Sequence, residues 1–163
     1  MLDAELWGDI AGTLSERHKL FHGDLAKHDT IDEIGEGVLA SAPERFVLIG
    51  FSMGGYVART MARRAPDCVR ALILIATSGR ADSPAEAERK ARSVKRVATQ
   101  GYSGLSRSSV LLTLHHSRRS DDPLIERVSD MAKRLGGDVF MRQAAHPRGG
   151  DLDRLADAPP VLP

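Results

Sequence analysis

The sequence contains one cysteine, Cys68, so no disulfide can form within the chain. A single thiol is typical of proteins from a reducing compartment and favours a cytoplasmic location. The longest apolar run, "ALILIA" at 71–76, is far shorter than the ~20 residues needed to cross a bilayer. The N-terminal stretch "MLDAELWGDI" has no basic segment followed by an apolar one. We therefore expect neither a signal peptide nor a membrane partner.

An excess of charge of one sign is also absent. The 23 basic residues nearly balance the 22 acidic ones, and the formal net charge is +1. Domains that bind nucleic acid usually carry a strong basic excess, so this balance argues against a nucleic-acid partner. Hydrophobic residues make up 42% and charged residues 28% of the 163 positions. Such a composition is typical of a globular chain that is long enough to bury a core.

Two apolar runs flank a helical pattern near the middle of the chain. "RFVLIG" at 45–50 and "RALILIA" at 70–76 are expected to be strands, and residues 53–64 a helix. Near-continuous apolar strands are typical of a parallel sheet that is covered on both faces. This order predicts a right-handed βαβ unit, and hence an α/β fold.

The segments around this unit predict mostly helices. A helix capped by Asp3 is expected at 3–17, followed by a short strand, "HKLFHGDL", at 18–25. The next helix begins at Thr30, where Glu33 has capping-box spacing. Residues 83–143 predict helices throughout, and the end of the chain is rich in Pro, Gly and Asp. The expected organisation is a core at 1–82, a helical cap-like segment at 83–145 and the start of a further core segment at 146–163.

The stretch "GFSMG" at 50–54 matches the pattern G-x-S-x-G between the expected strand and helix. In this context the pattern forms a nucleophile elbow, a strained turn that exposes the serine hydroxyl. Side chains two positions on either side of Ser52 would collide in the turn, which explains Gly50 and Gly54. Gly54 and Gly55 also let the helix pack close to the strand.

Ser52 is therefore the candidate nucleophile. The backbone N–H of Met53, at the helix N-terminus, is a candidate oxyanion donor. Two other interpretations stay open. A glycine-rich turn between a strand and a helix needs no chemistry. Gly50-x-Ser52-x-x-Gly55 also loosely matches the dinucleotide-binding pattern G-x-G-x-x-G, although serine replaces the middle glycine, where the backbone must approach the pyrophosphate.

The elbow, together with "LDAELW" at 2–7, "HKLFHGDLAKHD" at 18–29 and "DPLIERVSDMAKRLGGDVFMRQ" at 122–143, resembles the α/β-hydrolase family, most closely its small esterase and lactonase-like members. The resemblance implies a partial α/β-hydrolase fold, with parallel strands around the elbow and a helical cap. It implies that Ser52 matches the nucleophile, Met53 one oxyanion donor and Asp24 a structural loop position. It further implies a small-molecule ester or acyl substrate, an acyl-enzyme on Ser52, and neither metal nor organic cofactor.

The resemblance covers the middle of a family member. Members carry a glycine-rich oxyanion loop before the "DAELW" stretch, and two strands with the acid and the histidine after the cap. We therefore expect a truncated hydrolase that is weakly active or inactive as given. The strand of the absent loop would lie between 18–23 and 45–50. Without it, open sheet edges and an exposed apolar face predict low solubility and self-association.

No histidine is identified as the catalytic base. Surface or packing roles are favoured for His18 and His22, and a solvated role for the adjacent pair His115 and His116, whose side chains should point apart. His146 carries no indicated role. For the acid, Asp82 follows the strand after the elbow, where some family members place one. An exposed residue in the first turn of the next helix explains Asp82 equally well. The alternative functions are a non-catalytic remnant that binds a partner chain or an acyl ligand, and a Rossmann-like or flavodoxin-like binding domain with a chance serine motif.

Overall fold

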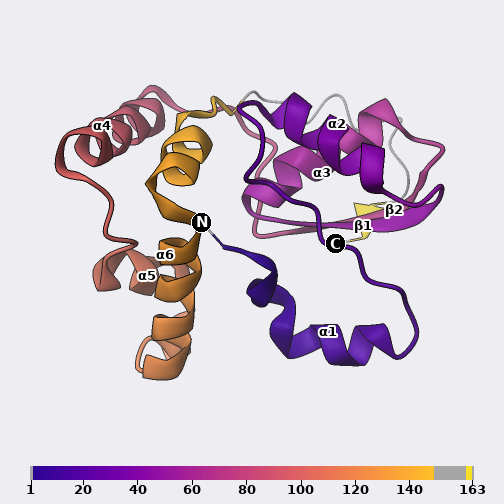
Figure 1. Cartoon of the computed structure of the whole chain (residues 1–163), viewed down its shortest axis with the longest axis horizontal. Helices are drawn as coiled ribbons and strands as arrows, with labels where there is room; N and C mark the ends of the chain where they lie inside the picture. Colours follow the sequence, from indigo (N-terminus) through magenta and orange to yellow (C-terminus); the bar gives the residue numbers. More distant parts are fainter. Residues whose placement is uncertain (1, 149–160, 163) are drawn as a thin grey trace. The chain divides into compact units, whose positions relative to one another are not determined.

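A computed structural model of the chain describes residues 2–148 and 161–162 (Figure 1). Contacts between Cα atoms divide the chain into two compact units. We call Gly23–Glu88 with His146–Pro163 the sheet unit, and Met1–His22 with Arg89–Ala145 the helical unit. None of the described helices is both long and apolar enough to span a membrane.

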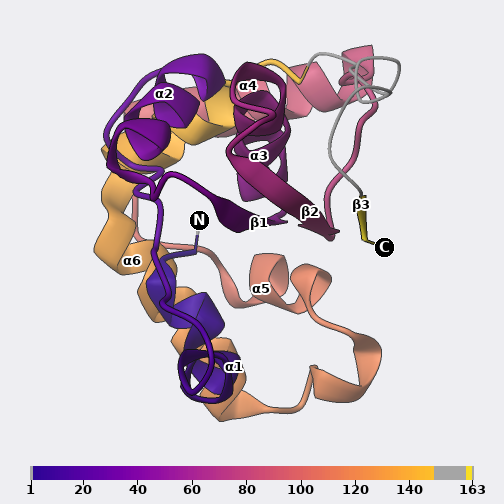
Figure 2. The same cartoon turned by 90° about the vertical axis from the view of Figure 1, so that its right-hand side faces the viewer.

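The sheet unit is built on a parallel sheet with the strand order β1-β2-β3. β1 (Phe46–Phe51) pairs with β2 (Val69–Ile75), and the short β3 (Val161–Leu162) lies on the other side of β2 (Figure 2). α3 (Met53–Arg64) follows β1 and leads to β2. The predicted order of strand, helix and parallel strand is therefore confirmed.

One face of this sheet is covered by α2 (Ile31–Ser41) and α3 (Figure 1, Figure 2). Two buried clusters lie between these layers; they contain Ile34, Val57 and Met61, and Ala58, Ala62, Val69 and Leu72. Aliphatic side chains that alternate along parallel strands and meet helices on one side account for this core.

The opposite face of the sheet is exposed. Val47, Ile49 and Ile75 are 54%, 36% and 39% exposed, and their positions alternate with those that contact the helices. The expectation of a sheet covered on both faces is therefore wrong for the described residues, because those of the sheet unit supply helices to one face only. The expected exposed apolar face is confirmed.

Local signals position the helices of the sheet unit. Thr30 caps α2: its hydroxyl accepts from the amide of Glu33 at 3.1 Å, and the Glu33 carboxylate accepts from the amide of Thr30 at 3.0 Å. The predicted capping box is therefore confirmed. Arg64, in the last turn of α3, forms ion pairs with Asp32, at 3.2 Å, and with Glu36 of α2. These contacts join the two helices that cover the sheet.

The helical unit contains two short N-terminal helices and the segment expected to be cap-like. Its elements are η1 (Ala4–Trp7), α1 (Gly8–Ser15), most of α4 (Pro84–Gln100), α5 (Arg107–Thr113), η2 (His116–Arg118) and α6 (Asp122–Ala145). Val110, Ile125, Val128 and Met131 form its buried cluster. Asp3 accepts from the amide of Glu5 at 3.0 Å, which confirms its predicted capping role.

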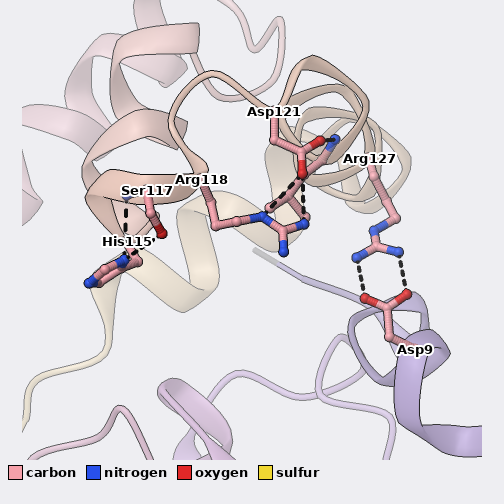
Figure 3. A network of polar contacts seen from close by, with 7 residues as sticks. Asp9, His115, Ser117, Arg118, Asp121 and Arg127 are labelled. Carbon is pink, nitrogen blue, oxygen red and sulfur yellow. Dashed lines mark hydrogen bonds and ion pairs between the residues drawn. The ribbon is translucent and has the colours of Figure 1, made fainter.

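Arginines of α6 bind the N-terminal segment within this unit. Arg127 donates two hydrogen bonds, of 2.8 and 2.7 Å, to the carboxylate of Asp9 (Figure 3). Arg134 donates to Asp3 at 2.9 Å and also to Glu5. The hydrogen bonds from Arg127 hold the pKa of Asp9 below its ordinary value of 3.8. These bidentate and paired contacts fasten η1 and α1 to α6.

Two expectations for local structure are wrong. Residues 18–25 form no strand, because a strand needs a neighbour to hydrogen-bond with and the described part of the sheet offers none there. Residues 83–143 are not helical throughout: Gly101 and Gly104 have φ of 81° and 93° between α4 and α5, and Gly136 interrupts α6 with φ of 79°. Glycine adopts this left-handed conformation readily, and a regular helix cannot contain it.

Candidate active site

Ser52 occupies a strained turn between β1 and α3. Its backbone has φ 50° and ψ −113°, a conformation that is rare for residues other than glycine. The Ser52 amide donates to the carbonyl of Ile75 at 2.9 Å, and its carbonyl accepts from the amide of Gly55 at 3.0 Å. The side chain makes no capping hydrogen bond to α3, and the residue is exposed. The turn therefore leaves the hydroxyl accessible at the N-terminus of a helix.

Two of the three glycines around the turn are required by close contacts. A Cβ atom added to Gly50 would lie 2.7 Å from the carbonyl oxygen of Gly54 and 2.8 Å from the Cβ of Ala58. One added to Gly55 would lie 2.5 to 2.6 Å from the side chain of Thr77. At Gly54 the nearest described atom is the Cδ1 of Leu25 at 3.7 Å, an ordinary contact. The collision expected at Gly50 is therefore confirmed, and the one expected at Gly54 is wrong.

Met53 is the first residue of α3. The first amides of a helix have no acceptor within the helix, and the helix dipole places partial positive charge there. The backbone N–H of Met53 is therefore a candidate donor to an anionic oxygen next to Ser52.

Asp82 follows β2 and is held by a segment far along the chain. Its carboxylate accepts from the backbone amide of Arg148 at 2.9 Å, and its own amide donates to the Arg148 carbonyl at 2.9 Å. The Asp82 side chain is only 9% exposed. The interpretation as an exposed first-turn residue is therefore wrong, because Arg148 covers the carboxylate. The first turn of α4 is capped instead by Ser83, whose amide donates to the Glu86 carboxylate at 2.9 Å.

A cavity of about 360 Å³ lies beside Asp82 within the sheet unit. Its lining includes the guanidinium groups of Arg80 and Arg148 and the carboxylates of Asp82 and Glu86. The ring of Tyr56 forms another wall, and the Arg148 guanidinium carbon lies 5.2 Å from the centre of this ring. The formal charges of the two basic and two acidic side chains in this lining balance. Among the described residues, no group of three or more His, Cys, Asp or Glu side chains could hold a metal ion.

The family model for the alpha/beta hydrolase fold matches residues 15–155. The chain belongs to this family. The predicted α/β class and partial α/β-hydrolase fold are thus confirmed, and the Rossmann-like interpretation is set aside.

Sequence relatives and solved structures agree with this assignment. The chain is 36% identical over 87 residues to a pimeloyl-[acyl-carrier protein] methyl ester esterase of Sodalis glossinidius. This aligned stretch covers 48% of this chain and 34% of the esterase. The protein of the same name from Edwardsiella ictaluri is 39% identical over 85 residues, covering 47% and 33%. The matched stretch spans about a third of the length of these curated relatives.

Two solved structures resemble almost the whole chain. A thermophilic esterase from Thermogutta terrifontis superposes with a TM-score of 0.79 at 25% identity. A hydrolase from Pseudomonas aeruginosa PA01 superposes with a TM-score of 0.81 at 22% identity, and this comparison shows similarity of fold alone. Each comparison covers 99% of this chain and 66% of the other.

The histidine that such a hydrolase requires is not assigned by the described contacts. Ser52 Oγ makes no hydrogen bond to any residue that the structure describes. His18 and His22 are exposed, in keeping with solvated roles. His146, which carried no indicated role, is 8% exposed. Its burial arises from tertiary packing. The local sequence, a histidine before a proline in a loop, does not predict that packing.

The adjacent pair His115 and His116 is exposed as expected, but the two rings do not point apart. Their centroids are 4.0 Å apart. His115 is the N-cap of η2, and its Nδ1 contacts the hydroxyl of Ser117 at 2.9 Å (Figure 3). This turn brings the rings together, which residue spacing alone does not predict.

Proposed function

We propose that this chain carries the nucleophile of a serine hydrolase that cleaves a small carboxylic ester or lactone. The conformation of Ser52 supports this proposal most directly. A serine with positive φ is held at the N-cap of a helix, yet the residue is exposed and its side chain does not cap that helix. Such strain is usually retained where a reactive group must be presented.

In the proposed reaction, Ser52 Oγ attacks the carbonyl carbon of the ester and loses its proton to a base. The base returns this proton to the leaving oxygen as the bond between that oxygen and the carbon breaks, and the acyl group remains on Ser52 as an ester. Water hydrolyses this acyl-enzyme, which releases the acid and restores the serine. The Met53 N–H donates a hydrogen bond to the oxyanion at each tetrahedral stage.

The base and the acid determine how fast such a site can work. Removing the histidine of a serine triad costs about six decades in turnover, or roughly 8 kcal/mol in the barrier. Asp82 keeps the position of a candidate acid after β2, but it would have to exchange its contact with Arg148 for a histidine. We therefore propose Ser52 and Met53 as site residues and expect weak activity unless a histidine reaches Ser52.

The substrate class rests on the relatives. The curated relatives are named as esterases of a methyl ester on a pimeloyl-acyl carrier protein. Their names support a carboxylic ester as the substrate, with a small alcohol as the leaving group. A lactone is the intramolecular form of the same functional group and reacts at the same carbonyl carbon.

The proposal is tested by intact-mass spectrometry of the purified chain after exposure to a fluorophosphonate, which reacts with activated serines. We expect one adduct on the wild type and none on Ser52→Ala. Ser78→Ala is the matched control, because Ser78 lies in the same unit and its hydroxyl accepts from the backbone of Arg80 at 3.1 Å. This control should keep the adduct. A wild-type chain that is folded by circular dichroism and gains no adduct would mean that Ser52 is not activated in this chain, and would refute the proposed activity.

A second candidate function is supported by the exposed face of the sheet. Val47 and Ile49 on β1 and Ile75 on β2 present apolar surface, and β1 is at the edge of the described sheet. In this alternative the chain is a non-catalytic remnant that binds another polypeptide or an acyl chain. We propose a second copy of the chain as the simplest partner for this surface.

A further inference from the structure

The turn that follows β2 mirrors the turn of Ser52. Among the described residues other than glycine, Ser52 and Ala76 have positive φ, of 50° and 49°. Each residue directly follows the last residue of its strand, and these last residues, Phe51 and Ile75, are register partners. The Ser52 amide donates to the carbonyl of Ile75 at 2.9 Å. Two strained turns therefore leave the sheet side by side and are joined by a hydrogen bond.

The residue after Ala76 packs directly against the elbow. A Cβ atom added to Gly55 would lie 2.5 Å from Thr77 Oγ1 and 2.6 Å from both its Cβ and its Cγ2. Ordinary contacts to a Cβ atom begin at about 3.4 Å, so the Thr77 side chain fills all the space beside Gly55. Since the Gly55 amide donates to the carbonyl of Ser52, a shift at Gly55 would be passed to Ser52.

The other side of this helix turn is closed as well. A Cβ atom added to Gly50 on β1 would lie 2.7 Å from the carbonyl oxygen of Gly54 and 2.8 Å from the Cα of Gly55. The first turn of α3 is therefore held between β1 and Thr77, with no room to move toward either.

We propose that Thr77 is a positioning residue for Ser52, and that it acts through the shape of its side chain against Gly55. Thr77 Oγ1 is buried and makes no hydrogen bond to any residue that the structure describes, so its volume, not its hydroxyl, fixes the turn. The strained φ of Ala76 brings Thr77 to this position. The expected effect of Thr77 on the reactivity of Ser52 rests on the proposed function. The contact between Thr77 and Gly55 does not depend on that function.

The test is a size exchange between the two residues. Gly55→Ala must displace the helix turn or Thr77 by roughly 1 Å, and such a displacement slows a positioned reaction by about 10- to 100-fold. We expect Gly55→Ala to slow fluorophosphonate labelling of Ser52 by this factor, at a temperature where circular dichroism shows it folded. The double variant Gly55→Ala/Thr77→Gly should recover most of the rate. Thr77→Val, which keeps the shape, should label as the wild type does.

Thermal melting tests the packing even if Ser52 does not label. Gly55→Ala should lower the midpoint by about 3–10 °C, and Thr77→Gly in the same chain should recover part of the loss. Gly54→Ala is the control for melting alone, because its added Cβ meets only Leu25 at 3.7 Å. If neither the wild type nor any variant labels, Ser52 is not activated in this chain, and the melting midpoints alone decide whether Thr77 fixes the position of Gly55. An unaffected Gly55→Ala, a double variant without recovery, or an impaired Thr77→Val would overturn the positioning role.

Discussion

The exposed face of the sheet predicts weak self-association that a lysine at Val47 should disrupt. Residues 46–51 of β1 include neither a proline nor a charged residue, the features that commonly protect edge strands. Val47 is 54% exposed, so replacing it with lysine removes little packing within the chain. In a pair of chains joined through this surface, the two new ammonium groups would face each other. The variant should therefore lose association and keep its fold.

The size of the effect follows from the exposed area. Val47, Ile49 and Ile75, at 54%, 36% and 39%, together expose somewhat more than one whole apolar side chain. Burying this apolar surface contributes about 2–4 kcal/mol per chain to the free energy of association, or roughly twice as much in a symmetric pair. Association itself costs on the order of 4–15 kcal/mol, which strand-edge hydrogen bonds only partly offset. In the most favourable case, about 8 kcal/mol gained against about 4 kcal/mol lost leaves about 4 kcal/mol, which corresponds to a dissociation constant near 1 mM, and Val47→Lys should raise this constant about tenfold or more.

Sedimentation velocity between about 50 µM and 1 mM reaches this dissociation constant and reports the mean mass directly. Leu112→Lys is the matched control, since Leu112 is 81% exposed but belongs to the helical unit. We expect the wild type and Leu112→Lys to grow in mean mass with concentration, and Val47→Lys to stay monomeric. A wild type that remains monomeric throughout, or an equal loss in both variants, would refute the role of the sheet face.

Three further predictions concern stability. Leu72 is 0% exposed at the centre of the sheet unit, so Leu72→Ala should lower the free energy of unfolding by about 2–5 kcal/mol in urea titrations, and an effect under about 1 kcal/mol would contradict the core assignment. Thr30→Ala removes the cap of α2 and should cost about 1 kcal/mol in the same assay, whereas Thr30→Ser should cost less. Because Arg127 lowers the pKa of Asp9, their contact stabilises the helical unit above the ordinary aspartate pKa of 3.8 and is lost as pH falls through the lowered value. Asp9→Asn should therefore speed amide exchange in α1 at neutral pH, and this difference should vanish in strong acid.

The elements that sequence predicted well are those specified by neighbouring residues. α3 covers the predicted residues 53–64, and the capping box at Thr30 forms with the expected Glu33. Each of these depends on contacts within four positions along the chain. The strand expected at 18–25 fails for the opposite reason, because a strand depends on a partner elsewhere in the sheet.

The same distinction separates the parts of the candidate site. The strained turn of Ser52 is a local feature, so a five-residue pattern was enough to predict it. The contact of Asp82 with Arg148 joins residues 66 positions apart, and that of Gly55 with Thr77 joins a helix to the turn after the next strand. Periodicity and spacing carry no information on such pairs. A catalytic histidine would likewise contact Ser52 from a distant position in the sequence, so spacing does not identify it.

The backbone at Ser52 offers a last test of whether the turn is kept for chemistry. A non-glycine residue in such a conformation costs about 1–3 kcal/mol, while glycine, which adopts it freely, costs about 0.5–1 kcal/mol in chain entropy. Ser52→Gly should therefore be about 0.5–2 kcal/mol more stable than Ser52→Ala, which removes the same hydroxyl but keeps the strain. Ala76→Gly should gain similarly, since Ala76 has nearly the same φ. If Ser52→Gly is no more stable than Ser52→Ala by urea titration, the turn is unstrained. A gain would mean that the serine is present at a cost to stability, as expected for a residue retained for its hydroxyl.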